Sequence, residues 1–123
     1  MAITNEIRRI PRKGRGVFAL RAYRPGEVIE RAPVIELDAK RWPQIRRTVL
    51  ADHVFEWGKT RMALALGQGS LYNHSEHPNA HGEPRIRERV IEFTAARRIR
   101  RGEEITIDYR GDETERSVWF KAK

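Results

Sequence analysis

The 123-residue sequence contains no cysteine. Disulfide bridges and thiolate-bound zinc are therefore excluded, because both need cysteine sulfur. No stretch reaches the roughly 18 uninterrupted apolar residues that a membrane helix needs, and residues 1–10 lack the apolar run of a secretory signal. We therefore expect a soluble, intracellular protein without membrane contact, in the cytoplasm or associated with chromatin or a nucleoid.

Lysine is scarce beside arginine: 5 Lys and 20 Arg stand against 17 acidic residues, which gives a net charge of +8. A field of this sign favours weak, salt-sensitive contact with nucleic acid. The alternative is an arginine-rich composition that only solvates the surface, and composition leaves both open. With 39% apolar residues the chain can bury one core, so we expect a single domain over residues 1–123.

Turn signals recur about every ten residues, and most segments between them alternate apolar with polar residues, which is typical of many short strands. The segments 25–29 and 101–105 share the pattern Gly-Glu-x-Ile, which predicts two tight turns that each lead into a strand. The predicted fold is mainly β with short helices (α+β). Its strands are expected at residues 16–20, 27–37 (one or two, broken near Pro33), 89–95 and 104–109.

One segment departs from the strand pattern. Trp42, Ile45 and Val49 follow at spacings of three and four residues, which predicts one short amphipathic helix with Asp38 as a candidate cap. Residues 62–66 fit either a strand or a helical turn, and the sequence pattern leaves that choice open.

Three segments could carry chemistry: Gly14-Arg15-Gly16-Val17-Phe18-Ala19, Tyr72-Asn73-His74-Ser75 with Pro78-Asn79, and Gly102-Glu103-Glu104-Ile105-Thr106-Ile107-Asp108-Tyr109. Glycines let a backbone approach a ligand closely, but the third glycine of a dinucleotide site is absent. His74, His77 and His81 could ligate a metal in principle. Because Pro78 disfavours one continuous helix, we expect no metal site.

The order and separation of these segments, with residues 62–67 leading into the second, resemble the SET-domain family of protein lysine methyltransferases across nearly the whole chain. The resemblance is closest to the short stand-alone viral and bacterial type. It implies a β-clip of small antiparallel sheets with a C-terminal knot-like crossing that makes Asn73 and Tyr109 neighbours. No pre-SET or zinc-binding post-SET region is expected.

The resemblance also implies S-adenosyl-L-methionine as the cofactor and Tyr109 as the active-site tyrosine. The residues expected to bind the cofactor are Gly14, Arg15, Gly16, Phe18, Asn73 and His74, with Trp119 as a candidate cover beside Phe120. The substrate channel is expected to include Tyr72, Ile107, Phe55 and Trp57. Ile107 stands where the family often has an aromatic residue, and its lack of a hydroxyl favours di- or trimethylation.

Methyl transfer to a lysine requires a neutral amine aligned with the sulfonium, and burial lowers the pKa of that amine. We therefore expect methylation of the ε-amine of a lysine in a protein substrate, such as a histone or other basic chromatin protein. Asp112, Glu113 and Glu115 are candidates to line the substrate groove. The alternatives are a non-catalytic SET-like module that binds protein or nucleic acid, and a DNA-binding structural protein. A homodimer is also expected, because so short a chain should expose apolar surface.

Overall fold

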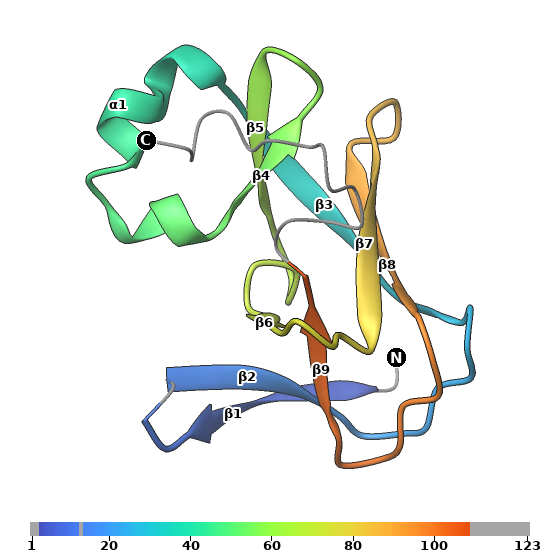
Figure 1. Cartoon of the computed structure of the whole chain (residues 1–123). Coiled ribbons are helices and arrows are strands. Elements are labelled where there is room, and N and C mark those ends of the chain that lie inside the picture. The colour runs from blue at the N-terminus through green and yellow to red at the C-terminus, as the bar shows by residue number, and fades with distance from the viewer. Residues whose placement is uncertain (1–2, 13, 109–123) are drawn as a thin grey trace.

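The computed structural model describes residues 3–12 and 14–108. Within them the chain forms nine strands and three short helical segments (Figure 1). One sheet has the strand order β1-β2-β9-β6 and the other has β4-β5-β3-β8-β7. The mainly β fold class is therefore confirmed. The strands are β1 (Asn5–Ile10), β2 (Gly14–Ala19), β3 (Val28–Asp38), β4 (Val54–Trp57), β5 (Arg61–Ala65), β6 (Asn73–His74), β7 (Ala80–Arg85), β8 (Val90–Ala95) and β9 (Glu104–Ile107).

One core lies between the two sheets, and alternation along the strands builds it. In β8, Ile91, Phe93 and Ala95 are buried while the residues between them are partly exposed. In β9, Ile105 and Ile107 are buried in the same way. Successive side chains of a strand point to opposite faces, so these five residues lie on the inner faces of their sheets.

The expected continuous helix is divided into three segments: η1 (Ala39–Arg41), α1 (Trp42–Ile45) and η2 (Val49–Asp52). Thr48 breaks it, because its backbone is extended and its hydroxyl accepts a hydrogen bond from Leu50 N–H, which starts a separate turn. Val49 is consequently 75% exposed instead of lying on an apolar face. No helix within residues 3–12 and 14–108 is long and apolar enough to span a membrane.

The rest of the helix prediction is correct at the level of single residues. Asp38 caps η1 by accepting a hydrogen bond from Lys40 N–H at 2.9 Å. Trp42 and Ile45 pack against a second, smaller apolar cluster that includes Met62. The segment that fitted two structures forms strand β5, with Met62 against this cluster.

The two Gly-Glu-x-Ile segments fold into equivalent turns. Glu27 N–H donates to Arg24 O, and Arg24 N–H donates back to Glu27 Oε1 at 2.9 Å. Glu103 N–H donates to Arg100 O, and Arg100 N–H donates to Glu103 Oε1, also at 2.9 Å. In each turn the glutamate also binds an arginine that precedes the turn, Arg21 in the first and Arg97 in the second.

Glycine occupies the third position of each turn because the backbone there is left-handed, with φ of +84° at Gly26 and +90° at Gly102. Gly26 N–H donates to Ala95 O, and Gly102 N–H donates to Ala19 O. Each turn is thus bonded to the strand end that leads into the other. The residues before the turns also pair through both their backbone groups, Tyr23 with Ile99.

Candidate functional site

The three motif segments come together at β9, which lies between β2 and β6 in the sheet. β2 pairs with β9 in antiparallel fashion, with Phe18 opposite Glu104. β6 pairs with β9 on the other side and in parallel fashion, with Asn73 opposite Thr106. Of the strand pairs in the described residues this is the parallel one, and it brings Asn73 beside the glycine segment, although they are far apart in sequence.

Asn73 is held by two acceptors. Its Nδ2 donates to Arg15 O at 2.7 Å and to Glu104 Oε2 at 2.8 Å. A carbonyl and a carboxylate accept hydrogen bonds, so the NH₂ group must face both of them and Oδ1 must face away. No donor among the described residues binds Oδ1, which leaves that oxygen available to a ligand.

Gly16 leaves the space that this arrangement needs. A Cβ at Gly16 would lie 2.6 Å from Glu104 Oε2, 2.7 Å from Ile10 Cδ1 and 3.0 Å from Asn73 Nδ2. A side chain there would therefore displace the Asn73–Glu104 contact. Gly14 serves a different purpose, because its φ of +93° lies in the left-handed region while the space around it is open.

Asn79 holds the backbone of β9 on both sides of Ile105. The residue is 2% exposed, its Nδ2 donates to Glu104 O at 2.8 Å and its Oδ1 accepts from Thr106 N–H at 2.9 Å. Nδ2 also approaches Glu103 Oε2 at 3.4 Å. A side-chain amide that satisfies a backbone donor and a backbone acceptor replaces a missing strand partner, so Asn79 sets the position of Glu104.

His74 lies at the exposed end of the same short strand. Its Nδ1 is 3.6 Å from Asp108 Oδ1, an ion pair when the imidazole is protonated. Ser75 N–H donates to Ile107 O at 2.9 Å and extends the pairing of the loop with β9. His74 and Ser75 therefore both contact the end of β9 that leads to Tyr109.

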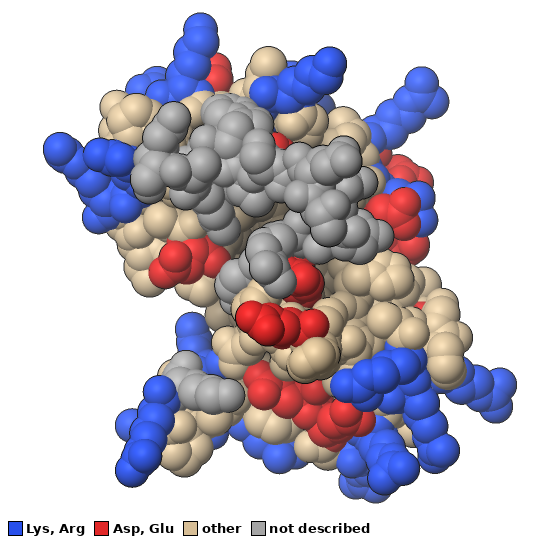
Figure 2. All heavy atoms as spheres, viewed as in Figure 1, with Lys and Arg blue, Asp and Glu red and all other residues tan. Residues whose placement is uncertain are grey.

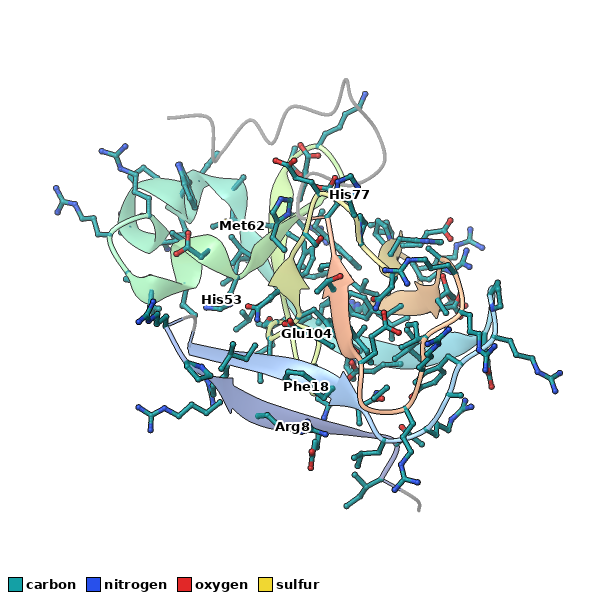
Figure 3. The ribbon with its side chains drawn as sticks, turned by 60° about the horizontal axis from the view of Figure 1, so that its bottom comes forward. Arg8, Phe18, His53, Met62, His77 and Glu104 are labelled. Atoms are coloured by element: carbon teal, nitrogen blue, oxygen red, sulfur yellow. The ribbon has the colours of Figure 1, made fainter. Side chains whose placement is uncertain are left out.

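Phe18 lies on the same face of the sheet as Glu104, and Arg8 lies over its ring with the guanidinium carbon 4.6 Å from the centroid. In Figure 3, Arg8, Phe18 and Glu104 lie one after another across the neighbouring strands β1, β2 and β9. Arg8 also pairs with Glu6. Of the residues predicted to bind the cofactor, the structure thus brings together Arg15, Gly16, Phe18 and Asn73.

Tyr72 is buried, at 1% exposure, and its hydroxyl donates to Glu30 Oε1 at 2.6 Å. Burial, followed by the charge of Glu30, raises the pKa of Tyr72 far above its ordinary value. The hydroxyl therefore stays protonated and bound to Glu30. Glu30 accepts a second hydrogen bond from Gln68 N–H at 2.9 Å.

The other residues predicted to form the channel are divided between two places. Phe55 and Tyr72 line a hollow of about 10 Å³, together with His53 and Ser70. Trp57 does not line it: that indole is 1% exposed and donates to Glu36 Oε2 at 2.8 Å. Ile107, at 2% exposure, lies in the main core.

The four histidines have separate neighbours. His53 Nδ1 lies 2.8 Å from Ser70 O, and because a carbonyl only accepts, this nitrogen carries the proton. His81 Nε2 lies 3.0 Å from Thr94 Oγ1, and His77 N–H donates to Ser75 Oγ. Across residues 3–12 and 14–108, no group of three or more His, Cys, Asp or Glu side chains could hold a metal ion.

Several predicted residues lie outside the described residues: Tyr109, Asp112, Glu113, Glu115, Trp119 and Phe120. Their roles stay predictions. Sequence reasoning, in turn, missed Glu104 and the way Asn79 holds β9. A signal for Glu104 exists in the repeated turns, because the position after Gly-Glu is apolar Val28 in the first and acidic Glu104 in the second.

The chain is similar to known proteins. A family model described as SET domain matches residues 14–110. The chain is 38% identical over 117 residues to a Schizosaccharomyces pombe protein named histone-lysine N-methyltransferase, H3 lysine-37 specific, covering 94% of this chain and 76% of that protein.

Two solved structures are also similar. One is a candidate histone methyltransferase of Plasmodium falciparum, with a TM-score of 0.73 and 31% identity, covering 97% of this chain and 99% of that one. The other is the Neurospora histone lysine methyltransferase DIM-5, with a TM-score of 0.71 over 92% of this chain and 54% of that one. At 18% identity the latter supports the fold alone.

Proposed function

Because this chain belongs to the SET-domain family and is a protein-lysine methyltransferase, we propose that it uses S-adenosylmethionine to methylate a lysine of a histone or another basic chromatin protein. The observation that carries the proposal is the joint of Gly16, Asn73 and Glu104, where the three motif segments meet. Within residues 3–12 and 14–108, no donor binds Asn73 Oδ1, and this oxygen lies beside Gly16, where a side chain would collide with Glu104. Such a place suits a ligand with a positively charged amine.

The described residues fit this cofactor. Gly16 keeps the backbone of the glycine segment accessible, and Asn73 Oδ1 is an acceptor for the ammonium of the methionine end. His74 and Phe18 lie next to Asn73 and Gly16 on β6 and β2. When bound, S-adenosylmethionine supplies a methyl group on a positively charged sulfur.

The remaining requirements fall on the chain's own side chains. We expect the Tyr109 hydroxyl to orient the incoming amine, and burial of that amine to lower its pKa so that it reaches the site without its proton. Ile107 offers no hydroxyl to hold a water beside the amine, which favours di- or trimethylation. Trp119 is expected to cover the site.

Charge on β9 supports a basic substrate. Glu103 directly precedes this strand, Glu104 is its first residue and Asp108 follows its end. On the face shown in Figure 2, one group of acidic side chains lies near the middle, over the region of β9, and most Lys and Arg side chains project from the outline, with further acidic side chains among them. The acidic group near β9 would therefore attract a lysine-containing basic peptide.

The cofactor proposal is tested by calorimetric titration of the protein with S-adenosylmethionine, repeated on Asn73→Ala. We expect saturable one-to-one binding that Asn73→Ala weakens at least tenfold, because an ammonium loses a charge-assisted hydrogen bond. Gln44→Ala is the control, because it removes a side-chain amide from α1, which is distant from Asn73 in the sequence. This variant should bind the cofactor like the intact protein. Absence of binding to the intact protein would contradict the proposal and favour a non-catalytic SET-like module.

The transfer itself is tested with Tyr109→Phe. We expect methyl incorporation into a histone mixture to fall by about 100-fold, because misorientation of a reacting group costs about that much, while cofactor affinity stays within about twofold. Equal incorporation by the intact protein and the variant would show that the tyrosine hydroxyl has no part in the reaction. Mass spectrometry of the product gives the number of methyl groups.

Two partner predictions remain beside the enzymatic one. Arg24, Arg98, Arg100 and Arg101 are exposed and form no ion pair with other described residues, which supports weak contact with nucleic acid. On the outer face of the second sheet, Ile35 is 48% exposed and Leu66 is 41% exposed, which supports a homodimer. Salt-dependent DNA binding and sedimentation at micromolar concentration test the two predictions.

A further inference from the structure

We propose that Glu104 is a positioning residue: it fixes the orientation of the Asn73 side-chain amide, so that Asn73 Oδ1 faces the cofactor's ammonium group. The inference rests on the proposed function and adds to it a residue that acts through Asn73. It follows from the chemistry of the Asn73 neighbours.

The side-chain amide of an asparagine can rotate by half a turn about its Cβ–Cγ bond. This rotation exchanges the positions of the NH₂ donor and the oxygen acceptor at almost no steric cost. Asn73 would lose its affinity for an ammonium in the turned state, because NH₂ would then face the positive charge. Arg15 O opposes that rotation with one hydrogen bond at 2.7 Å, and Glu104 Oε2 opposes it with a second at 2.8 Å. The carboxylate contact is charge-assisted and is thus the stronger of the two.

Glu104 is itself held in place. Asn79 binds its carbonyl oxygen at 2.8 Å and the N–H of Thr106 at 2.9 Å, so the backbone on both sides of Ile105 is fixed. The Glu104 carboxylate also lies directly against Gly16, with Oε2 only 2.6 Å from the position that a Cβ of residue 16 would occupy. An acceptor whose backbone is clamped and whose carboxylate fills the space over Gly16 can hold a neighbouring amide in one orientation.

The test compares two ligands and two substitutions. S-adenosylhomocysteine carries the ammonium-bearing amino-acid end, and 5′-methylthioadenosine lacks it. Glu104→Met removes the acceptor at nearly constant length, whereas Glu104→Gln removes the charge and keeps an acceptor oxygen. We expect Glu104→Met to weaken S-adenosylhomocysteine at least tenfold and 5′-methylthioadenosine by less than twofold. Glu104→Gln should restore most of that loss.

A matched control lies on the same sheet. Glu6 is opposite Phe18 on β1, as Glu104 is on β9, so Glu6→Met makes the same chemical change on the same face without reaching Asn73. It should leave both affinities unchanged. Nitrogen-15 labelled protein adds a reading without ligand: the Asn73 NH₂ signals should shift in Glu104→Met and stay in place in Glu6→Met.

The outcomes separate the two claims. Equal weakening of both ligands by Glu104→Met, or unchanged Asn73 NH₂ signals, would overturn the positioning role and leave the proposed function standing. If the intact protein bound neither ligand, the proposed function would fail and the positioning role with it. A variant of Glu104 that does not fold is recognised by its thermal unfolding curve, and Glu104→Gln then decides: it should keep the preference for S-adenosylhomocysteine that the intact protein shows, and loss of that preference would overturn the role.

Discussion

The turn at residues 24–27 and the turn at residues 100–103 have the same backbone bonds, the same left-handed glycine and the same glutamate that binds a backbone N–H and a preceding arginine. They differ in the residue that follows. After the first turn comes Val28, which is 44% exposed, and after the second comes Glu104, which binds Asn73. Equal local sequence has produced equal turns, and one position beside them carries the difference in function.

The second turn differs also in its support. Asn79 contacts Glu103 and holds the backbone of Glu104 and Thr106, whereas no side-chain amide supports the first turn among the described residues. The first turn therefore only leads into β3, whereas the second leads into a strand whose first side chain contacts Asn73. The following substitutions test that division.

Asn79→Ala should have the largest effect on stability. It leaves Glu104 O and Thr106 N–H, which are part-buried, without their partners, at about 2–4 kcal/mol of unfolding free energy for the two groups. Urea denaturation measures the loss. Asn73→Ala is the control, because its amide is only half-buried and should cost less than about 1 kcal/mol. Equal losses for the two asparagines would contradict the support we assign to Asn79.

Gly26→Ala and Gly102→Ala should have intermediate and equal effects on stability. At both positions an added Cβ meets open space, so the cost is the left-handed backbone alone, about 1–2 kcal/mol. Cofactor affinity should distinguish them, since only Gly102 precedes β9 and the Asn73 contact. Thermal unfolding and calorimetry of both variants check this prediction, and equal loss of affinity in the two would remove the functional difference between the turns.

Glu27→Gln and Glu103→Gln should have the smallest effects, visible through pH. The hydrogen bond from Arg21 and then that from Arg24 N–H hold the pKa of Glu27 below its ordinary value. Burial acts to raise the pKa of Glu103, but hydrogen bonds from Arg100 N–H, Asn79 and Arg97 outweigh it and lower that pKa too.

A carboxylate with a lowered pKa in the folded state stabilises the protein above its unfolded pKa of about 4.3, and the contribution is lost as pH falls through the folded value. Each glutamine variant should therefore lose stability at neutral pH and approach the intact protein in acid. For Glu103→Gln we expect less than about 1 kcal/mol. Unfolding midpoints from about pH 3 to 7 measure it, and a loss that persists unchanged at the acid end would exclude this linkage.

The sequence predicted those elements whose signal is local. Alternation identified β8 and β9, and the repeated Gly-Glu-x-Ile identified both turns. β7 escaped prediction because its sequence, Ala-His-Gly-Glu-Pro-Arg, has no alternation and owes its strand to pairing with β8. Local spacing also joined Val49 to a helix that Thr48 interrupts.

The site divides in the same way. The glycine segment and Asn73 were predicted from motifs, but partners distant in sequence were not. The Tyr72 hydroxyl donates to Glu30, which lies 42 residues earlier in the sequence. No sequence pattern near Tyr72 predicts that its hydroxyl has a carboxylate acceptor. Glu104 likewise becomes a site residue only because β2, β6 and β9 lie side by side.

The parallel pairing of β6 with β9 has a consequence for the order in which contacts form. Arg15, Asn73 and Glu104 come from the early, middle and late parts of the sequence, and contacts of such long range form after local ones. Before β9 has paired, Asn73 lacks the Glu104 carboxylate that accepts its hydrogen bond, and the edge of β2 has no partner strand on that side. The contact that orients the Asn73 side chain is therefore among the later ones to form, since it needs β2, β6 and β9 to be paired.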